Sequence, residues 1–99
     1  MVGCHVSHLY PDGASLYFTV FARQDPHDPV AQWTAAKRAA SDAIAAAGAT
    51  ITHHHAVGLD HASYVGAEVG DTGVAALRAL KRELDPAGIM NPGKLLPSD

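Results

Sequence analysis

Apolar and polar residues alternate along the first part of the chain, and this pattern predicts β-strands. Residues 2–9 and 15–22 are rich in β-branched and aromatic side chains, and each run has the length of a strand. Between them stands Pro11-Asp12-Gly13, which is typical of a turn because proline presets the first turn angle and glycine accepts positive φ. We therefore predict an antiparallel hairpin of residues 2–9 and 15–22.

The second predicted strand has two unlike faces, because neighbouring side chains of a strand point to opposite sides. The apolar face consists of Leu16, Phe18, Val20 and Ala22. The opposite face consists of Tyr17, Thr19 and Phe21. We expect the first face to meet the core, and a register shift of one residue would exchange the two faces.

A helix is predicted from about residue 29 to residue 47. Asp28 can cap its start, Pro29 suits the first helical position, and Gly48 suits the left-handed position that ends a helix. Apolar residues recur on one side at helical spacing, namely Trp33, Ala36, Ala40, Ile44 and Ala47. The many alanines indicate close packing on a sheet.

The second half of the chain predicts shorter elements. Residues 50–52 read as a short strand, and residues 59–69 as a short helix or an ordered loop. A second main helix is predicted over about residues 72–84, and it ends before Pro86 because the residue before a proline disfavours helix. Residues 85–97 have the composition of turns.

This order of elements predicts an α+β fold, in which an antiparallel sheet (the hairpin plus the short strand) is covered by helices. The side chains expected to be buried are Leu16, Phe18, Val20, Trp33, Ile44, Leu77 and Leu84. The first strand begins almost at residue 1, and a sheet of so few strands is a poor stand-alone unit. We therefore expect further strands to come from elsewhere.

Composition narrows the class of protein. A chain of 99 residues is one modest domain at most, and 47% hydrophobic with 17% charged residues is typical of a soluble globular protein. A net charge of -3 gives no electrostatic reason to expect nucleic acid as a partner. The single cysteine, Cys4, excludes an internal disulfide and favours a reducing, cytoplasmic compartment. We expect neither a signal peptide nor a membrane span.

Three consecutive histidines, His53, His54 and His55, form the most unusual segment. Imidazole exchanges protons near neutral pH and is a common metal ligand. Adjacent side chains of an extended segment point to opposite sides, so a metal site would need His53 and His55 with partners from elsewhere. Those partners could be His5, His8 or His61. A packed or solvated run and an acid/base cluster facing a flavin or substrate are the other interpretations.

Two further segments offer groups that bind ligands. Gly58 permits close backbone approach or positive φ just after the histidines. The segment Asn91-Pro92-Gly93-Lys94 combines an amide, a rigid turn and a cation. Taken alone, such a tail is also typical of a capped chain end.

Together these segments resemble the alkyldihydroxyacetonephosphate synthases, which are flavin-dependent enzymes of the vanillyl-alcohol-oxidase superfamily. Thr-Ile-Thr-His-His-His-Ala-Val-Gly at residues 50–58 is similar to their histidine-triplet motif. Residues 7–18 resemble the hairpin that brings a catalytic tyrosine to that site, and residues 85–96 resemble the closing segment of flavin-linked oxidases generally. The three segments, in this order, cover nearly the whole chain.

Lactate- and glycolate-type dehydrogenases of the same superfamily show another pattern, with Gly-Glu-His-Gly-Ile-Gly at the triplet and two metal-binding histidines on the hairpin. Here His54 stands at the glutamate position and Tyr17 at the position of the second hairpin histidine. Both departures favour the synthase pattern. After Gly58, Leu59-Asp60-His61 stand where synthases tend to have basic residues, which leaves the exact substrate open.

The resemblance implies FAD as cofactor and a lipid-type substrate, with the acyl chain of acyl-dihydroxyacetone phosphate exchanged for a long-chain alcohol in ether-lipid synthesis. It implies proton transfer by Tyr17, supported by His8. It also implies acid/base roles for His53, His54 and His55, and flavin contacts for His54, His55 and Asn91. It implies no metal.

The resemblance further implies that this chain is the C-terminal, substrate-side piece of an enzyme whose FAD-binding domain is absent from the 99 residues. We expect that domain as the partner, in the same full-length chain or as a split partner, and an inactive isolated chain. A homodimer and peripheral membrane association stay open. The alternatives are a flavin-linked oxidase or dehydrogenase of an alcohol or 2-hydroxy acid, and a non-enzymatic, histidine-rich metal-binding module.

Overall fold

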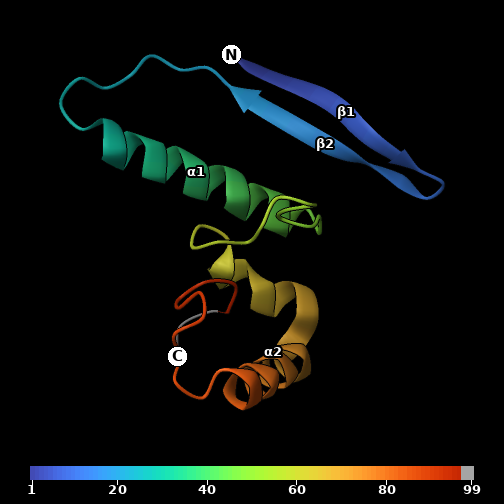
Figure 1. The fold of residues 1–99 in the computed structure, drawn as a ribbon. Coiled ribbons are helices and arrows are strands. Elements are labelled where there is room, and N and C mark those ends of the chain that lie inside the picture. The colour runs from blue at the N-terminus through green and yellow to red at the C-terminus, as the bar shows by residue number, and fades with distance from the viewer. Residues whose placement is uncertain (97–99) are drawn as a thin grey trace. The chain divides into compact units, whose positions relative to one another are not determined.

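The computed structural model describes residues 1–96, so that Pro97 of the turn-rich tail lies outside the described residues. The elements are β1 (Val2–Tyr10), β2 (Gly13–Val20), α1 (Pro29–Ala46), the 3-10 helix η1 (Ala62–Tyr64) and α2 (Val65–Leu84) (Figure 1). This content confirms the predicted α+β class. The chain divides into two compact units, Met1–Arg38 and Ala39–Asp99, and each is described by itself.

Strands β1 and β2 form the predicted antiparallel hairpin, closed by a turn at Pro11 and Asp12. Met1 and Phe21 extend it, because the backbone of each residue donates a 2.9 Å hydrogen bond to the carbonyl of the other. The register aligns apolar partners on one face, in the pairs Val2–Val20, Cys4–Phe18 and Val6–Leu16. The alternation seen in the sequence therefore sets the two faces of the hairpin as expected.

The expected burial of the apolar positions was wrong, because none of the seven side chains is buried. Leu16, Phe18, Val20, Trp33 and Leu84 are all exposed, with Phe18 at 50% and Leu84 at 68%. Ile44 and Leu77 are half-buried. The physical reason is that two strands, or one side of a single helix, do not carry enough neighbouring atoms to enclose a large side chain.

Helix α1 begins and ends through the residues that the sequence indicated. The Asp28 carboxylate accepts a 2.9 Å hydrogen bond from the Ala31 amide, as expected of an N-cap. Gly48 has φ +73°, and the Gly48 and Ala49 amides bond the carbonyls of Ala45 and Ile44. This pair of bonds is the Schellman arrangement, which satisfies carbonyls at the helix end that would otherwise lack a donor.

The second unit departs from the sequence prediction at its first segment. Residues 50–52 pair with no strand, and within residues 1–96 the sheet contains only β1 and β2. The Ile51 amide instead donates a 2.7 Å hydrogen bond to the Glu68 carboxylate of α2. An isolated extended segment needs some partner for its backbone, and here a side chain supplies it.

The ambiguous stretch 59–69 is helical, because it contains η1 and the first turn of α2. Gly70 interrupts α2 with a non-helical backbone (φ 71°, ψ 170°), so a regular helical segment starts again at residue 71, close to the predicted start. The Tyr64 hydroxyl donates a 2.6 Å hydrogen bond to the Asp42 carboxylate, which ties η1 to the end of α1. Ser41, Ala62, Val65 and Val74 are buried in this unit.

Asp85 closes the end of α2 and is 7% exposed. Its carboxylate accepts 3.0 Å hydrogen bonds from the amides of Ile89 and Met90, and it also forms an ion pair with Lys81. The Lys81 ammonium donates a second hydrogen bond to the Met90 carbonyl. We call these contacts among Lys81, Asp85, Ile89 and Met90 the Asp85 clamp. They hold the segment after the helix against its last turn.

The Asp85 clamp makes the stability of the fold depend on pH. The hydrogen bond from Lys81 is the largest cause that lowers the pKa of Asp85 below its ordinary value of 3.8, and the Met90 and Ile89 amides act in the same direction. A carboxylate whose pKa is lower in the folded state stabilises the fold above its unfolded-state pKa, and the stability is lost as the pH falls through the folded-state pKa.

We therefore expect the midpoint of urea unfolding to fall as the pH drops below about 4, and Asp85→Asn to flatten this dependence. Unfolding followed by helical circular dichroism between neutral pH and about pH 2 measures it. Asp71→Asn, a change of the same kind elsewhere in α2, should keep the wild-type dependence. An unchanged pH dependence in Asp85→Asn would contradict the assignment.

Candidate functional site

Tyr17 lies on the polar face of the hairpin, as the alternation predicted. The register places Tyr17 opposite His5, Thr19 opposite Gly3 and Ser15 opposite Ser7. Side chains of directly opposed residues share a face, so the imidazole of His5 and the phenol of Tyr17 are neighbours across the strands. Tyr17 is 55% exposed. A hydroxyl among small polar side chains is accessible to a ligand on this face.

His8 occupies a β-bulge in β1. The register shifts between Ser7 and Leu9, and His8 has the positive φ of 51° that an inserted residue often needs. A 2.6 Å hydrogen bond joins the Ser7 hydroxyl and Nδ1 of His8. The bulge therefore takes His8 out of the regular alternation of side chains between the two faces of the hairpin, and the bond to Ser7 holds its imidazole. Support of Tyr17 by His8 stays a prediction.

The histidine triplet lies in the irregular segment between α1 and η1. All three rings are exposed, and they pack in sequence, with centroids 4.5 Å apart for His53–His54 and 5.9 Å for His54–His55. The Thr52 hydroxyl donates a hydrogen bond to the His55 carbonyl, which closes a turn around the rings. The turn brings three imidazoles together, whereas an extended strand would have pointed them to opposite sides.

The C-terminal segment lies beside the backbone that follows the triplet. The Leu95 amide donates a 3.3 Å hydrogen bond to the Gly58 carbonyl, and a β-carbon at Gly93 would lie 4.0 Å from the Leu59 side chain. In Figure 1 the red tail passes close to the yellow part of the chain that leads into η1. The structure therefore brings together two of the three segments singled out in the sequence, the triplet loop and the Asn91–Lys94 turn.

Backbone strain marks this contact. Gly58, Asn91, Gly93 and Leu95 all have positive φ, between 46° and 71°. Glycine adopts such angles at little cost, whereas Asn91 and Leu95 do so only where the surroundings hold them. Lys94 turns back on the segment, since its ammonium donates a 3.3 Å hydrogen bond to the Pro92 carbonyl. Residues 91–95 therefore form an ordered loop, in which Asn91 is exposed.

The described residues offer groups suited to the flavin ring of FAD but not to its pyrophosphate. Around Gly58 and the tail, imidazoles and the Asn91 amide supply the polar groups that a flavin ring can use, and nothing lies within 4 Å of a β-carbon added at Gly58. A pyrophosphate needs a cradle of backbone amides, usually from a glycine-rich turn. Residues 1–96 contain no such run of glycines.

The described part of the chain shows neither a metal-binding cluster nor a membrane-spanning helix. No group of three His, Cys, Asp or Glu side chains within residues 1–96 is arranged to hold a metal ion. In the same residues, neither helix has the length and apolar character needed to cross a bilayer. Cys4 is an exposed free thiol.

Sequence reasoning missed the side chains that order this region. Asp85 was interpreted only as the end of a helix before Pro86, and Glu68 was not considered. The spacing of Lys81 and Asp85, four residues apart at the end of a helix, is the signal that could have identified the clamp. The bond from Ile51 to Glu68 joins residues 17 apart in sequence and carries no local signal.

Comparison with known proteins gives a match over most of the chain. The family model described as "FAD linked oxidases, C-terminal domain" matches residues 1–95. Alkyldihydroxyacetonephosphate synthase of Trypanosoma brucei brucei is 36% identical over 97 residues, which are 98% of this chain and 16% of that protein. The synthase of Dictyostelium discoideum is 35% identical over 94 residues, or 95% of this chain and 15% of that protein.

A different relative matches over a shorter stretch. Glycolate oxidase subunit GlcD of Bacillus subtilis is 42% identical over 52 residues, which are 52% of this chain and 11% of that protein. The chain thus spans about a sixth or less of the length of these curated relatives. No solved structure matches the chain.

The hydrogen bond from the Thr52 hydroxyl to the His55 carbonyl can be tested by mutation. Replacing Thr52 with Val keeps the shape of the side chain but removes the hydroxyl that holds the His55 carbonyl, and such a bond contributes about 1 kcal/mol. We expect the imidazole resonances of His53, His54 and His55 to move toward those of free histidine in NMR spectra. Thr52→Ser retains the hydroxyl and should keep the wild-type spectrum. Identical spectra for all three proteins would show that the hydroxyl does not order the turn.

Proposed function

The chain belongs to the family of C-terminal domains of FAD-linked oxidases, and from this premise we propose that it is the substrate-side part of an alkyldihydroxyacetonephosphate synthase-like enzyme. The observation that carries the proposal is the triplet turn. His53, His54 and His55 stand together, and Gly58, which follows them, accepts a hydrogen bond from the Leu95 amide of the tail. Two synthases at about 35% identity match nearly the whole chain, which supports this assignment.

In this proposal the protein's own side chains move protons. The Tyr17 hydroxyl, on the polar face opposite His5, transfers a proton at its phenolic oxygen to or from the substrate carbon that carries the acyl group. The imidazoles of His53, His54 and His55 exchange protons with the departing carboxylate and the incoming alcohol. Three imidazoles that lie close together in one turn supply several proton-exchanging groups, and this suits a reaction in which one group leaves and another enters.

His54, His55 and Asn91 are the residues that would hold the flavin ring. They belong to the unit in which the tail bonds the backbone after the triplet. When bound, FAD supplies an electron-accepting ring system beside the substrate. The remaining groups that FAD requires, above all the amides for its pyrophosphate, would come from a separate FAD-binding domain.

The partner in this proposal is that FAD-binding domain, in the same polypeptide or as a separate chain. The relatives are far longer than this chain, which spans 16% of the Trypanosoma protein. The hairpin presents an apolar face with Val6, Leu16 and Phe18 each at least half exposed. A face of this kind is normally covered by another layer of protein. The substrate in this proposal is a lipid-type small molecule.

The second candidate is a flavin-linked oxidase or dehydrogenase of a 2-hydroxy acid, and the similarity to glycolate oxidase subunit GlcD favours it. It requires hydride transfer from substrate to flavin. The two candidates differ in what the substrate does to the flavin. A 2-hydroxy acid bleaches oxidised flavin in a dehydrogenase, whereas the exchange of an acyl chain for an alcohol leaves the flavin oxidised at the end of each turnover.

The isolated 99-residue chain should bind FAD weakly, with a Kd above about 10 μM, because ring contacts alone leave the charged half of the dinucleotide unbound. Quenching of flavin fluorescence on titration with the chain measures this affinity. No exchange of acyl chain for alcohol should occur. Tight, stoichiometric binding of FAD by the isolated chain would show that the proposed FAD-binding domain is not required.

The catalytic role of Tyr17 can be tested in a graft in which this chain replaces the aligned segment of the Trypanosoma synthase. Tyr17→Phe should lower the turnover by about 10²- to 10⁴-fold, because it removes a proton-transfer group, and should leave the flavin bound. Exchange of labelled hexadecanol into acyl-dihydroxyacetone phosphate measures turnover. Tyr10→Phe, which removes a hydroxyl from the same hairpin, is the matched control and should keep the activity.

Three outcomes would count against the proposal. Full activity in the Tyr17→Phe graft would remove tyrosine from the mechanism. Bleaching of the grafted flavin by glycolate or lactate would favour the dehydrogenase. Binding of one zinc ion per chain at submicromolar concentration in equilibrium dialysis would favour a histidine-rich metal-binding module.

A further inference from the structure

The Asp85 clamp and the triplet loop are connected through the tail between them. The clamp holds the amides of Ile89 and Met90 on a carboxylate that is 7% exposed. Asn91 follows immediately in the chain. Four residues further on, the Leu95 amide bonds the Gly58 carbonyl at 3.3 Å. One short segment thus runs from the clamp to the backbone that follows His55.

The two ends of this segment differ in strength. A neutral hydrogen bond of 3.3 Å is long, and on its own it holds an exposed tail weakly. The clamp combines an ion pair with two backbone amides on one carboxylate, and charge-assisted bonds of this kind are roughly twice as strong as neutral ones. The order of the tail therefore originates mainly at the clamp.

The segment between these ends is stiff enough to transmit that order. Pro92 fixes one backbone angle, and Asn91, Gly93 and Leu95 hold positive φ. Lys94 braces the turn through the Pro92 carbonyl. A short, bent segment with one end fixed leaves its other end few positions to occupy, so Leu95 is presented to Gly58.

We propose that Asp85 is a positioning residue, which acts through the tail to set both the Asn91 amide and the loop that carries the histidine triplet. Its side chain contacts neither. It holds Met90, and Met90 determines where Asn91 begins and where Leu95 meets Gly58. The consequence for flavin and substrate rests on the proposed function, whereas the ordering of the loop does not.

Amide hydrogen exchange in the 99-residue chain tests the ordering directly. Asp85→Asn keeps the size of the side chain but removes its charge. It also replaces one accepting oxygen with an NH2 group, which cannot accept the hydrogen bond from the Met90 N–H. We expect amide exchange to accelerate about tenfold or more at Met90, which Asp85 bonds, and also at Leu95, which Asp85 does not contact. The imidazole resonances of His55 should shift in the same variant. Unchanged exchange at Leu95 would overturn the proposal.

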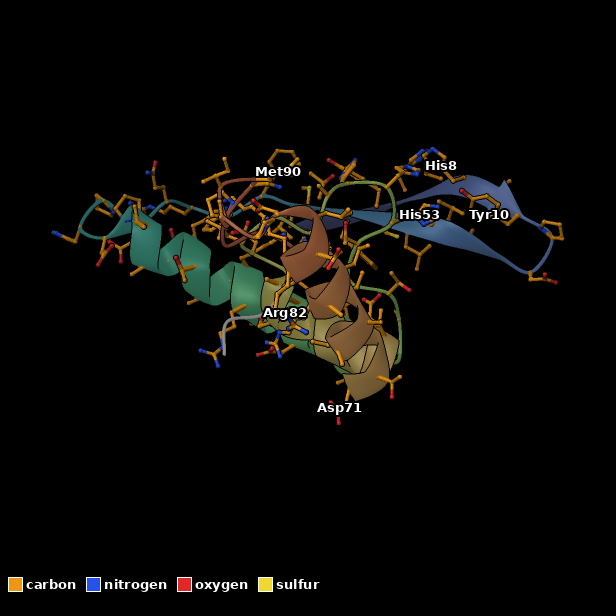
Figure 2. All side chains as sticks on the ribbon, turned by 60° about the horizontal axis from the view of Figure 1, so that its bottom comes forward. His8, Tyr10, His53, Asp71, Arg82 and Met90 are labelled. Atoms are coloured by element: carbon orange, nitrogen blue, oxygen red, sulfur yellow. The ribbon has the colours of Figure 1, made fainter. Side chains whose placement is uncertain are left out.

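Two controls separate positioning from general loss of stability. Asp71→Asn changes another aspartate of α2, and Figure 2 shows Asp71 well away from Met90. Exchange at Leu95 should stay at the wild-type rate in this variant. The Gly48 amide, which closes the end of α1, reports a general loss of stability of the unit. Its exchange should accelerate much less than that of Leu95 in Asp85→Asn and should keep the wild-type rate in Asp71→Asn.

A second pair of variants keeps the test decisive if Asp85→Asn unfolds the chain. Lys81→Met removes the ammonium and leaves the carboxylate with its two backbone amides, so the helix end is retained. Lys81→Arg restores a donor that can reach the carboxylate and the Met90 carbonyl. Exchange at Leu95 should accelerate in Lys81→Met and return toward the wild-type rate in Lys81→Arg. Equal rates in these two variants would also overturn the proposal.

A double-mutant cycle on the grafted enzyme tests the functional consequence. If Asp85 acts through Asn91, Asp85→Asn and Asn91→Ala should each weaken FAD binding about tenfold, and the double variant should be no weaker than either. Effects that multiply would contradict action through Asn91. An Asn91→Ala graft with unaltered FAD binding would instead contradict the proposed flavin contact, while the exchange result would still decide the role of Asp85.

Discussion

Two strands cannot bury the apolar face that they create, and this constraint governs the first unit of the protein. The register places Val6 beside Leu16 and Cys4 beside Phe18 on one face, yet these side chains stay largely in contact with solvent. Burying them would contribute about 25 cal/mol for each Å² removed from water, a gain that only an added layer of protein can provide. The exposed face is therefore a physical reason for the proposal that a further layer of protein covers the hairpin.

The second unit is held in a different way. Few of its side chains are buried, and polar groups carry much of its order: Tyr64 on Asp42, Glu68 on the Ile51 amide, and the Asp85 clamp on the tail. The first of these bonds joins η1 to α1, and the other two join an irregular segment to α2 or to the residue that follows it. The triplet loop and the tail are thus positioned by carboxylates in α2 or at its end. A site built on irregular backbone needs such supports, because loops have no regular ladder of hydrogen bonds to hold them.

Family membership and geometry contribute different parts of the functional argument. The family relationship establishes a C-terminal domain of the FAD-linked oxidases, and the resemblance of the triplet and of Tyr17 narrows the proposal to a synthase. The geometry adds that the histidine rings lie close together in one turn and that Leu95, just after the Asn91–Lys94 turn, bonds the Gly58 carbonyl. That Tyr17 and the triplet face a common ligand stays a prediction.

The sequence by itself determined the hairpin, its two faces, both ends of α1 and the break before the main part of α2. These features depend on near neighbours, since alternation, turn residues, the Asp28 cap and Gly48 act within a few positions. Only the tertiary structure decided the burial of Asp85, the absence of a strand at residues 50–52 and the contact of Leu95 with Gly58. Burial depends on which layers meet. A segment such as 50–52 joins a sheet only where a strand edge is within reach, and here the Glu68 carboxylate bonds its Ile51 amide instead.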